Sequence, residues 1–374
     1  MKVCYLTSAL SHHDGWGRYS LKVVKSVLQR GIEPVVLTSV GKSEEELSGV
    51  ELDPILVPLF SGMSLVSLRM FESWSQVRRH AAGCDLVHCL VELYAPLAAF
   101  SSWGRPYIIS GVGTHAVLPL EHPLKGIGFR LIYRNAAKIV CISEFTRRRI
   151  LEHVSLDNTV VIPLGVDSDF FQDIPVPVSS KKDFPIVLSV GALKPRKGYD
   201  VSIRAVAIAR KLVPNLRYVI IGDSGASEYA RYLRLLVTEL GLGDEVRFLG
   251  QVSEAELKAR YYSCDLFLLT PVQEGVAFEG FGLVYLEAGA CGKPVVGSRS
   301  GGVPDAVVDG QTGLLVPEGD VEATANAIVR VLSDPDLSKR LGRAGQERAR
   351  ELSWEAYAQR LEKVYQDALT QRSG

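Results

Sequence analysis

The chain has 374 residues, a length typical of about two domains of ordinary size. It is 47% hydrophobic and 22% charged, so it can bury a substantial core and extended disorder is not expected. Lys plus Arg and Asp plus Glu both number 42, and this balance argues against a nucleic-acid-binding protein, which would usually have an excess of basic residues.

Six cysteines are present without a C-x-x-C pair, and Cys4, Cys141 and Cys264 lie in or beside apolar runs. This pattern predicts buried, reduced thiols and no metal site. No apolar run approaches the roughly 20 residues that span a bilayer, and the start of the chain suits a first strand better than a signal peptide. We therefore expect an intracellular, cytoplasmic protein.

Strand-like runs alternate with helix-like segments through the first half of the chain, and the alternation restarts after residue 184. This pattern is typical of parallel strands joined by crossover helices. Ser253, with Glu256 three residues later, and Asp320 are expected to cap helices. The expected strands are 3–7, 34–38, 85–89, 107–110, 139–142 and 160–163, and then 186–190, 218–221, 246–249, 266–269, 294–296 and 314–316.

A segment rich in Pro, Ser and Lys separates the two halves and is predicted to be a linker. The fold class is therefore expected to be α/β, with two doubly wound Rossmann-like domains facing an interdomain cleft, because ligands bind at the carboxyl ends of such strands. We expect residues 1–171 to form the first domain, 172–184 the linker and 185–352 the second domain. Residues 353–374 are expected to form a helix that returns to the first domain.

Two glycines, Gly15 and Gly17, flank Trp16 between the first expected strand and the first expected helix. Backbone N–H groups at a helix start attract anions, and glycine lets a ligand approach closely. The alternative is a plain strand-to-helix turn. A dinucleotide-binding fingerprint would need a third glycine, where Ser20 stands, and an acid near Thr38, so a nicotinamide cofactor is not expected.

A basic pair, Arg196 and Lys197, follows the strand expected at 186–190 and precedes a helix expected from about Asp200. Cations at the carboxyl end of a strand, beside a helix start, suit a diphosphate. The alternative is a solvated basic loop.

Two carboxylates, Glu279 and Glu287, bracket a glycine turn and an apolar helical run. The helix is expected to begin near Phe281 or Gly282, where its free N–H groups can receive phosphate or sugar oxygens. Eight residues at 3.6 per turn place the two acids only about 80° apart, so both can face one ligand. The alternative is that Glu279 only complements the helix dipole and that Glu287 is solvated.

Three motifs of the second half resemble the donor-binding domain of the family 4 retaining glycosyltransferases, which have the two-Rossmann (GT-B) fold. They are VLSVGALKPRKG (187–198), EGFGLVYLEAGACGKPVV (279–296) and SGGVPDAVVDGQTGLLVP (300–317). The first half resembles the family more loosely, through Gly15-x-Gly17, CISEFTRRRI (141–150) and VIPLGVD (161–167). The resemblance covers nearly the whole chain.

The resemblance implies a metal-independent enzyme without a cofactor. It would transfer a sugar from a nucleotide-diphosphate sugar, such as a UDP-sugar or GDP-sugar, to an acceptor hydroxyl with retention of configuration. The second domain would bind the donor, and the first would bind a glycan, lipid-linked or small-molecule acceptor. The expected setting is the biosynthesis of polysaccharides, glycolipids or other glycoconjugates.

The resemblance also implies roles for single residues. Glu287 would bind the donor ribose, Glu279 would lie by the donor sugar, and Lys197 would pair with the diphosphate. Loop residues of the first domain would face the acceptor or the diphosphate. The further donor-binding residues are Arg196, Gly280, Phe281, Gly282, Leu283 and Val252, and the loop residues are Gly15, Trp16 and Gly17.

The chain departs from the family pattern at two positions. Ala192 stands where the family often has an arginine, so Arg196 or Lys194 would have to supply the charge. Val112 stands where the family commonly has a histidine, and His115 follows three residues later. His115 is the candidate catalytic histidine, with acceptor binding or a structural role as the alternatives.

An amphipathic segment, residues 63–82, places Phe71 and Trp74 beside Arg78 and Arg79. It could rest on the inner face of a membrane, or it could be a core helix with a solvated face.

Two other functions remain open from the sequence, namely a sugar-nucleotide epimerase or hydrolase, and a non-catalytic subunit that only binds sugar nucleotide. Donor-only product analysis and calorimetry would separate them.

Overall fold

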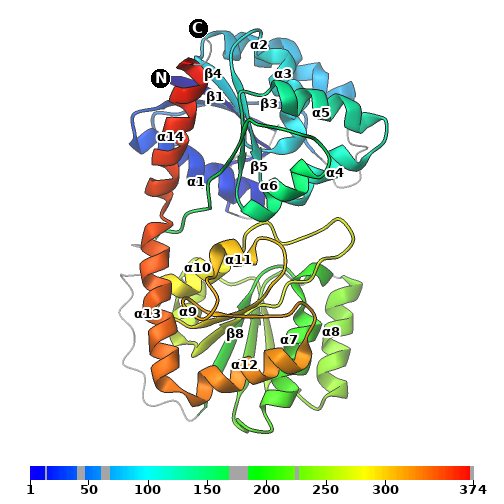
Figure 1. The fold of residues 1–374 in the computed structure, drawn as a ribbon, viewed down its shortest axis with the longest axis vertical. Coiled ribbons are helices and arrows are strands. Elements are labelled where there is room, and N and C mark those ends of the chain that lie inside the picture. Colours follow the sequence, from blue (N-terminus) through cyan, green and yellow to red (C-terminus); the bar gives the residue numbers. More distant parts are fainter. Residues whose placement is uncertain (13–14, 40–46, 60–67, 168–183, 224–226, 371–374) are drawn as a thin grey trace. The chain divides into compact units, whose positions relative to one another are not determined.

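The computed structural model describes residues 1–12, 15–39, 47–59, 68–167, 184–223 and 227–370. The chain divides into two compact units (Figure 1). The first comprises Met1–Leu164 and Trp354–Gly374, and the second comprises Gly165–Ser353. Residues 172–183 of the expected linker lie outside the described residues.

The first unit is built on a seven-stranded sheet with the order β3-β2-β1-β4-β5-β6-β7, and every neighbouring pair is parallel. The inner strands coincide with the apolar runs of the sequence and are buried on both faces. The edge strand β3 was not expected, because it contains Pro54 and, apart from the buried Leu56, has only exposed and half-buried residues. The strands are β1 Lys2–Leu6, β2 Glu33–Ser39, β3 Glu51–Leu56, β4 Leu86–Cys89, β5 Tyr107–Gly111, β6 Lys138–Cys141 and β7 Thr159–Val161.

The helices of the first unit come from both ends of the chain. The last of them, α14, lies against α1 (Figure 1). Their bounds are α1 Gly15–Gln29, η1 Leu68–Ser73, α2 Trp74–Ala82, η2 Glu92–Tyr94, α3 Ala95–Ser101, α4 Thr114–Glu121, α5 Lys125–Asn135, α6 Glu144–Leu151 and α14 Trp354–Thr370.

A chain of buried hydrogen bonds ties α14 to this sheet. The Tyr365 hydroxyl lies 2.6 Å from His88 Nδ1, and His88 Nε2 lies 3.0 Å from the Ser110 hydroxyl. The Tyr19 hydroxyl then lies 2.7 Å from both Ser110 Oγ and the Tyr357 hydroxyl. Burial lowers the pKa of His88 to about 3, so the imidazole is neutral and the network carries no buried charge. The C-terminal helix is therefore an integral part of the first unit.

The second unit has a six-stranded parallel sheet with the order β10-β9-β8-β11-β12-β13. As predicted, Ser253 and Asp320 cap helices, since their side chains accept the N–H groups of Glu256 and Ala323. The strands are β8 Ile186–Val190, β9 Arg217–Ile221, β10 Val246–Gly250, β11 Leu266–Leu268, β12 Val295–Ser298 and β13 Leu314–Val316. The helices are η4 Pro195–Lys197, α7 Tyr199–Ala209, α8 Glu228–Glu239, α9 Glu254–Ser263, α10 Leu283–Ala290, α11 Val303–Ala306, α12 Val321–Ser333 and α13 Pro335–Glu351.

Helices α10 and α13 pack at backbone distance through glycines. A Cβ atom on Gly342 would lie 2.1 Å from the carbonyl oxygen of Gly292, and one on Gly289 would lie 3.0 Å from that of Gly345. Only glycine permits this approach, which fixes α10 and the residues it carries.

Two sequence predictions concern the chain as a whole. All six cysteines are free and buried, as predicted. Within the described ranges, no helix is long and apolar enough to cross a membrane.

Candidate functional site

The centre of the candidate site in the second unit is Glu279. Its Oε2 atom accepts hydrogen bonds from Lys197 Nζ at 2.6 Å and from Arg196 Nη1 at 2.8 Å. Glu279 and Lys197 are each only 9% exposed. The sequence motif at 187–198 and the glutamate motif at 279–296 thus meet at one carboxylate oxygen.

Lys197 is positioned by a short 3-10 turn, η4, that follows β8. The turn ends at Gly198, which has φ 64° and ψ 33°. A Cβ atom there would lie 1.8 Å from the Thr270 carbonyl oxygen, just beyond β11, so only glycine fits. The Arg196 carbonyl oxygen accepts the Val272 N–H at 2.9 Å, which holds the same turn against the β11 side. The sequence predicted this location at the carboxyl end of a strand, and α7 begins at Tyr199, close to the expected residue.

Glu279 is held from its main chain as well as its side chain. Its carbonyl oxygen accepts the Gly302 N–H at 2.8 Å. Gly301 has φ 56°, and a Cβ atom on it would lie 2.3 Å from that same oxygen. The third motif of the sequence, 300–317, therefore supports the loop that carries Glu279.

The electrostatics of the cluster favour a charged carboxylate. Burial by itself raises the pKa of a carboxyl, but the two adjacent cations outweigh it, so the pKa of Glu279 lies below its ordinary value. Burial lowers the pKa of Lys197, and the attraction of Glu279 opposes that effect only in part. Lys194 is exposed, whereas Arg196 contacts Glu279, so of these two cations only Arg196 lies at the carboxylate.

The helix after Glu279 begins later than expected. The first residue of α10 is Leu283, and Gly282 is its N-cap with φ 90° and ψ 52°. The expected start at Phe281 or Gly282 is therefore corrected, because Gly282 in the left-handed region cannot belong to the helix. The Gly280 and Phe281 N–H groups belong to the preceding loop, and the Phe281 side chain is buried. The N–H groups of the first turn still begin at Leu283.

Glu287 lies inside α10 and is 9% exposed. Its Oε2 atom accepts a 2.7 Å hydrogen bond from the Tyr261 hydroxyl of α9. Glu287 is therefore not a solvated helix residue, and Tyr261 is a supporting residue that sequence reasoning missed.

Val252 is half-buried in the loop between β10 and α9. Among the described residues, no group of three or more His, Cys, Asp and Glu side chains could hold a metal ion.

The candidate loop of the first unit differs from its prediction. Helix α1 begins at Gly15, so Gly15, Trp16 and Gly17 form the first turn of the helix and do not precede it. The N–H groups of a first helical turn have no carbonyl acceptor within the helix itself. The Trp16 ring lies 4.8 Å from the His115 ring, with 51° between the planes. Trp16 and His115, which the sequence treated separately, therefore form one contact.

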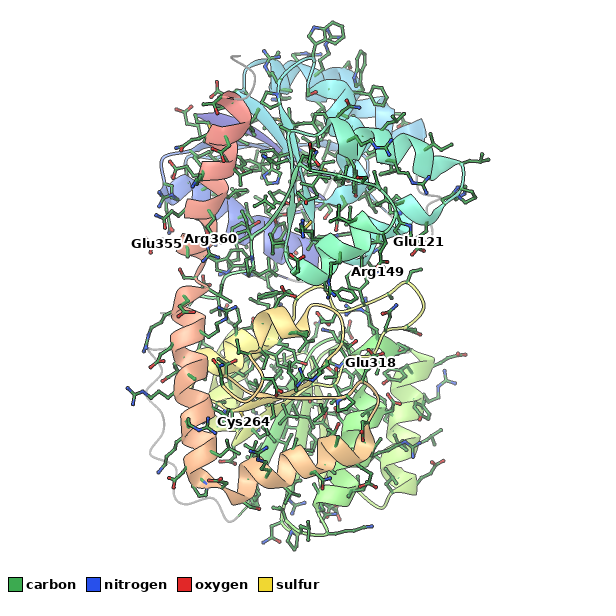
Figure 2. The ribbon with its side chains drawn as sticks, in the orientation of Figure 1. Glu121, Arg149, Cys264, Glu318, Glu355 and Arg360 are labelled. Atoms are coloured by element: carbon green, nitrogen blue, oxygen red, sulfur yellow. The ribbon has the colours of Figure 1, made fainter. Side chains whose placement is uncertain are left out.

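His115 is exposed on the first turn of α4. The far end of α4 is tied to α6 by an ion pair between Glu121 and Arg149, at 3.4 Å (Figure 2). Sequence reasoning missed a buried acid beside the turn that precedes His115. Glu92, the first residue of η2, is fully buried, and its Oε1 accepts the Val112 N–H at 2.7 Å.

Comparisons with known proteins support the same family in both halves. The model of glycosyl transferases group 1 matches residues 171–348, and the model of glycosyltransferase family 4 matches residues 13–170. A D-inositol 3-phosphate glycosyltransferase of Stackebrandtia nassauensis is 34% identical over 394 aligned positions, which cover 96% of this chain and 88% of that protein. A GDP-mannose-dependent alpha-(1-6)-phosphatidylinositol monomannoside mannosyltransferase of Mycolicibacterium smegmatis is 33% identical over 270 residues, 68% of this chain and 67% of that protein.

Solved structures give the fold. HepE of Anabaena, in complex with UDP and glucose, superposes with a TM-score of 0.75 at 21% identity and covers 97% of this chain and 98% of its own. The two parallel-sheet α/β units are thus those of the GT-B fold, as predicted. With both halves matched, and with relatives above 30% identity over most of their length, the chain belongs to the family 4 glycosyltransferases.

Proposed function

We propose that this glycosyltransferase takes its sugar from a nucleoside-diphosphate sugar held by the second unit, and that it transfers the sugar with retention of configuration and without a metal ion. The observation that carries the proposal is the pair of cations on Glu279 Oε2. Two cations gathered at the end of β8 and beside a helix start suit the two charges of a diphosphate.

In the structure, the carboxylate of Glu279 accepts hydrogen bonds from both cations. A bound diphosphate would offer them stronger acceptor oxygens, and Glu279 would then be free to accept a hydrogen bond from a hydroxyl of the donor sugar. Glu279 is proposed as the catalytic carboxylate in this sense. The N–H groups of Gly280, Phe281, Gly282 and Leu283 would receive sugar or phosphate oxygens.

The rest of the donor is assigned to the same unit. Glu287, oriented by Tyr261, would accept hydrogen bonds from the ribose hydroxyls, and Val252 would contact the base. One relative is named for GDP-mannose, and HepE was solved with UDP. We therefore propose that the donor nucleotide is GDP or UDP.

Catalysis would be largely electrostatic. The bond between the anomeric carbon and the diphosphate breaks with its electron pair going to the nucleoside diphosphate. The acceptor oxygen bonds to the same carbon, and its proton passes to the departing diphosphate oxygen. Lys197 and Arg196 would stabilise the charge that develops on the leaving group, an effect larger in a site that excludes water.

The acceptor is assigned to the first unit, where Trp16 on the first turn of α1 meets His115 on the first turn of α4. A half-buried indole packed against an exposed imidazole offers an apolar face and a polar edge, which suits a polyhydroxylated acceptor. The named acceptors of the two relatives contain inositol and phosphate. D-inositol 3-phosphate and phosphatidylinositol are therefore the first acceptors to test.

A membrane-surface role is proposed for α3 and α5 and not for residues 63–82. Residues 63–67 lie outside the described residues, and in α2 the apolar Val77 and Ala81 face the interior. Large apolar side chains are instead exposed next to basic ones on and around α3 and α5, which contact each other. They are Phe100, Trp103, Leu124, Ile127 and Leu131, with Arg134 on the same helix face.

A screen of sugar nucleotides by thermal shift tests the proposal, because a tightly bound donor raises the unfolding temperature by mass action. The donor that stabilises most is then incubated with and without D-inositol 3-phosphate or phosphatidylinositol. A new glycoside only in the presence of acceptor supports the proposal. An epimerised or hydrolysed sugar from donor alone, or binding without turnover, would refute it.

A further inference from the structure

The carboxyl group of Glu92 is the most deeply buried acid beside the proposed acceptor residues, with no exposed surface. Its Oε1 atom accepts the Val112 N–H at 2.7 Å. Its Oε2 atom has no hydrogen-bond partner within the part of the chain that the structure describes. A buried carboxyl oxygen without a partner is costly, so its presence calls for a physical reason.

The group that Glu92 holds is the turn between β5 and α4. Val112 follows β5, and Gly113 is the N-cap of α4 with φ 148° and ψ −138°, a conformation that only glycine adopts without strain. His115 is the second residue of the helix that this turn begins. The hydrogen bond from Val112 therefore fixes the turn that leads into α4, two residues before His115.

Glu92 is also close to the second acceptor residue. The Trp16 side chain lies near enough to favour the charged form of the carboxyl, and its ring lies 4.8 Å from that of His115. One buried carboxyl thus adjoins both the turn that begins α4 and the indole against which His115 packs.

We propose that Glu92 is a positioning residue of the transfer reaction, which holds the Val112–Gly113 turn so that His115, packed against Trp16, presents a fixed surface to the acceptor. This inference rests on the proposed assignment of Trp16 and His115 to the acceptor. Glu92 acts through those two residues and does not touch the reacting atoms.

The protonation state of Glu92 is set by its surroundings. Burial raises the pKa of Glu92 to about 7, and the Val112 and Gly113 amides and Trp16 oppose this rise in part. The proton belongs on Oε2, because Oε1 already accepts a hydrogen bond. Glutamine is therefore a close mimic of the neutral form, with its oxygen facing Val112.

The buried thiols, phenols and imidazole around Glu92 do not titrate between pH 6 and 8.5. Burial raises the pKa values of the thiols and phenols around it, to about 12 for Tyr19 and Cys141, and lowers that of His88 to about 3. On α4 the charged or titratable groups are His115 and Glu121, and Glu121 is paired with Arg149. The buried groups are Tyr19 on α1, His88 and Cys89 on β4, Tyr107 on β5, Tyr133 on α5 and Cys141 on β6.

Nuclear magnetic resonance of the full chain with 13C-labelled histidine tests the inference, with His115 assigned by its loss in His115→Asn. We expect Glu92→Ala to shift the His115 signal and Glu92→Gln to restore it at pH 6. Tyr94→Phe is the matched control, since it removes a buried 2.8 Å hydrogen bond to Val57 from the same 3-10 turn. If the His115 signal has the same chemical shift in Glu92→Ala as in Tyr94→Phe, the inference is wrong.

Kinetics provide the second readout, with D-inositol 3-phosphate and phosphatidylinositol in detergent micelles as acceptor probes. Glu92→Ala should lower kcat/KM for the acceptor by roughly tenfold, while calorimetry with UDP or GDP shows no change in donor-nucleotide affinity. If the wild-type protein transfers no sugar to either probe, the acceptor assignment fails, and the His115 signal still decides whether Glu92 positions the turn.

If Glu92→Ala does not fold, the pH dependence of kcat/KM in Glu92→Gln tests the inference instead. The ratio of kcat/KM for Glu92→Gln to that of the wild type should be near one at pH 6 and should rise above pH 7, because only the wild-type carboxyl ionises. The same comparison in the His115→Asn background removes the histidine as a source of the change. A ratio that stays flat from pH 6 to 8.5, or a His115 signal in Glu92→Gln that differs from the wild type at pH 6, would overturn the inference.

Discussion

Lys197 Nζ lies 2.6 Å from Glu279 Oε2, although the two residues are 82 positions apart in the chain. Both side chains are 11% exposed, so the pair is nearly removed from water. Removing Glu279 would leave Lys197 and Arg196 without their carboxylate, and the loss of one partner of a buried ion pair commonly costs about 3–5 kcal/mol. The pair therefore connects the stability of the second unit to its proposed donor site.

The stabilising effect of Glu279 should disappear in acid. Its pKa in the folded protein is lowered from an ordinary value of 4.5, so its contribution is complete above about pH 4.5 and is lost as the pH falls through the folded value. The difference in Tm between the wild type and Glu279→Gln should be constant from pH 5.5 to 7.5 and should shrink below pH 4.5. A difference that does not change with pH would show that Glu279 is not held as a carboxylate.

Tyr261→Phe should weaken nucleoside-diphosphate binding. The substitution removes the 2.7 Å hydrogen bond that orients Glu287 and leaves that carboxylate with one donor fewer. A hydrogen bond to a charged group is worth about 1.5–3 kcal/mol, so calorimetry should show a loss of affinity of about tenfold or more. Tyr232→Phe, which removes only an exposed hydroxyl, is the control and should bind like the wild type. Equal affinities for all three proteins would argue against the ribose role of Glu287.

Gly342→Ala should destabilise the second unit. Its Cβ atom would lie 2.1 Å from the Gly292 carbonyl oxygen, so α13 would have to move away from α10. Overpacking of this kind typically costs about 1–3 kcal/mol, and Tm should fall accordingly. Gly128→Ala on α5 is the matched control, because nothing lies within 4 Å of its added Cβ atom and alanine favours a helix. The packing account would be wrong if both variants had the wild-type Tm.

The exposed apolar residues of α5 should bring the protein to anionic lipid. The double substitution Ile127→Glu and Leu131→Glu should abolish sedimentation with vesicles that contain anionic phospholipid, because it removes apolar area and adds negative charge. Leu235→Glu, at an exposed position on α8 of the second unit, is the control. If the double variant sediments like the wild type, or if the wild type does not sediment at all, the proposed membrane surface is wrong.

Much of the fold follows from patterns that the sequence displays directly. The apolar runs that became β1, β4 and β8 alternate with helical segments, and Ser253 and Asp320 mark helix starts by their chemistry. Edge strand β3 escaped prediction because Pro54 and a half-exposed pattern resemble a loop. The starts of α1 and α10 were misplaced because glycine is compatible with a turn, an N-cap and a first helical turn alike.

The residues of the candidate site that belong to sequence motifs could be predicted, and those whose role depends on tertiary contacts could not. Arg196, Lys197 and Glu279 were identified from their sequence context, but their convergence on one oxygen depends on the approach of β8 to the loop before α10. Tyr261 and Glu92 gave no signal, because their importance comes from a single hydrogen bond to a residue far along the chain. The sequence alone does not distinguish a buried glutamate from an exposed one.

The proposed donor site can be tested most directly by calorimetric titration of UDP and GDP into the wild type, Lys197→Ala, Lys194→Ala and Glu279→Gln. Lys197→Ala should weaken the tighter nucleotide by about tenfold or more, since it removes a charge-assisted contact to the diphosphate. Lys194→Ala, which removes an exposed cation of the same loop, should bind like the wild type. Glu279→Gln should bind at least as tightly, because the diphosphate no longer competes with a carboxylate for Lys197 and Arg196. Wild-type affinity in Lys197→Ala would contradict the account.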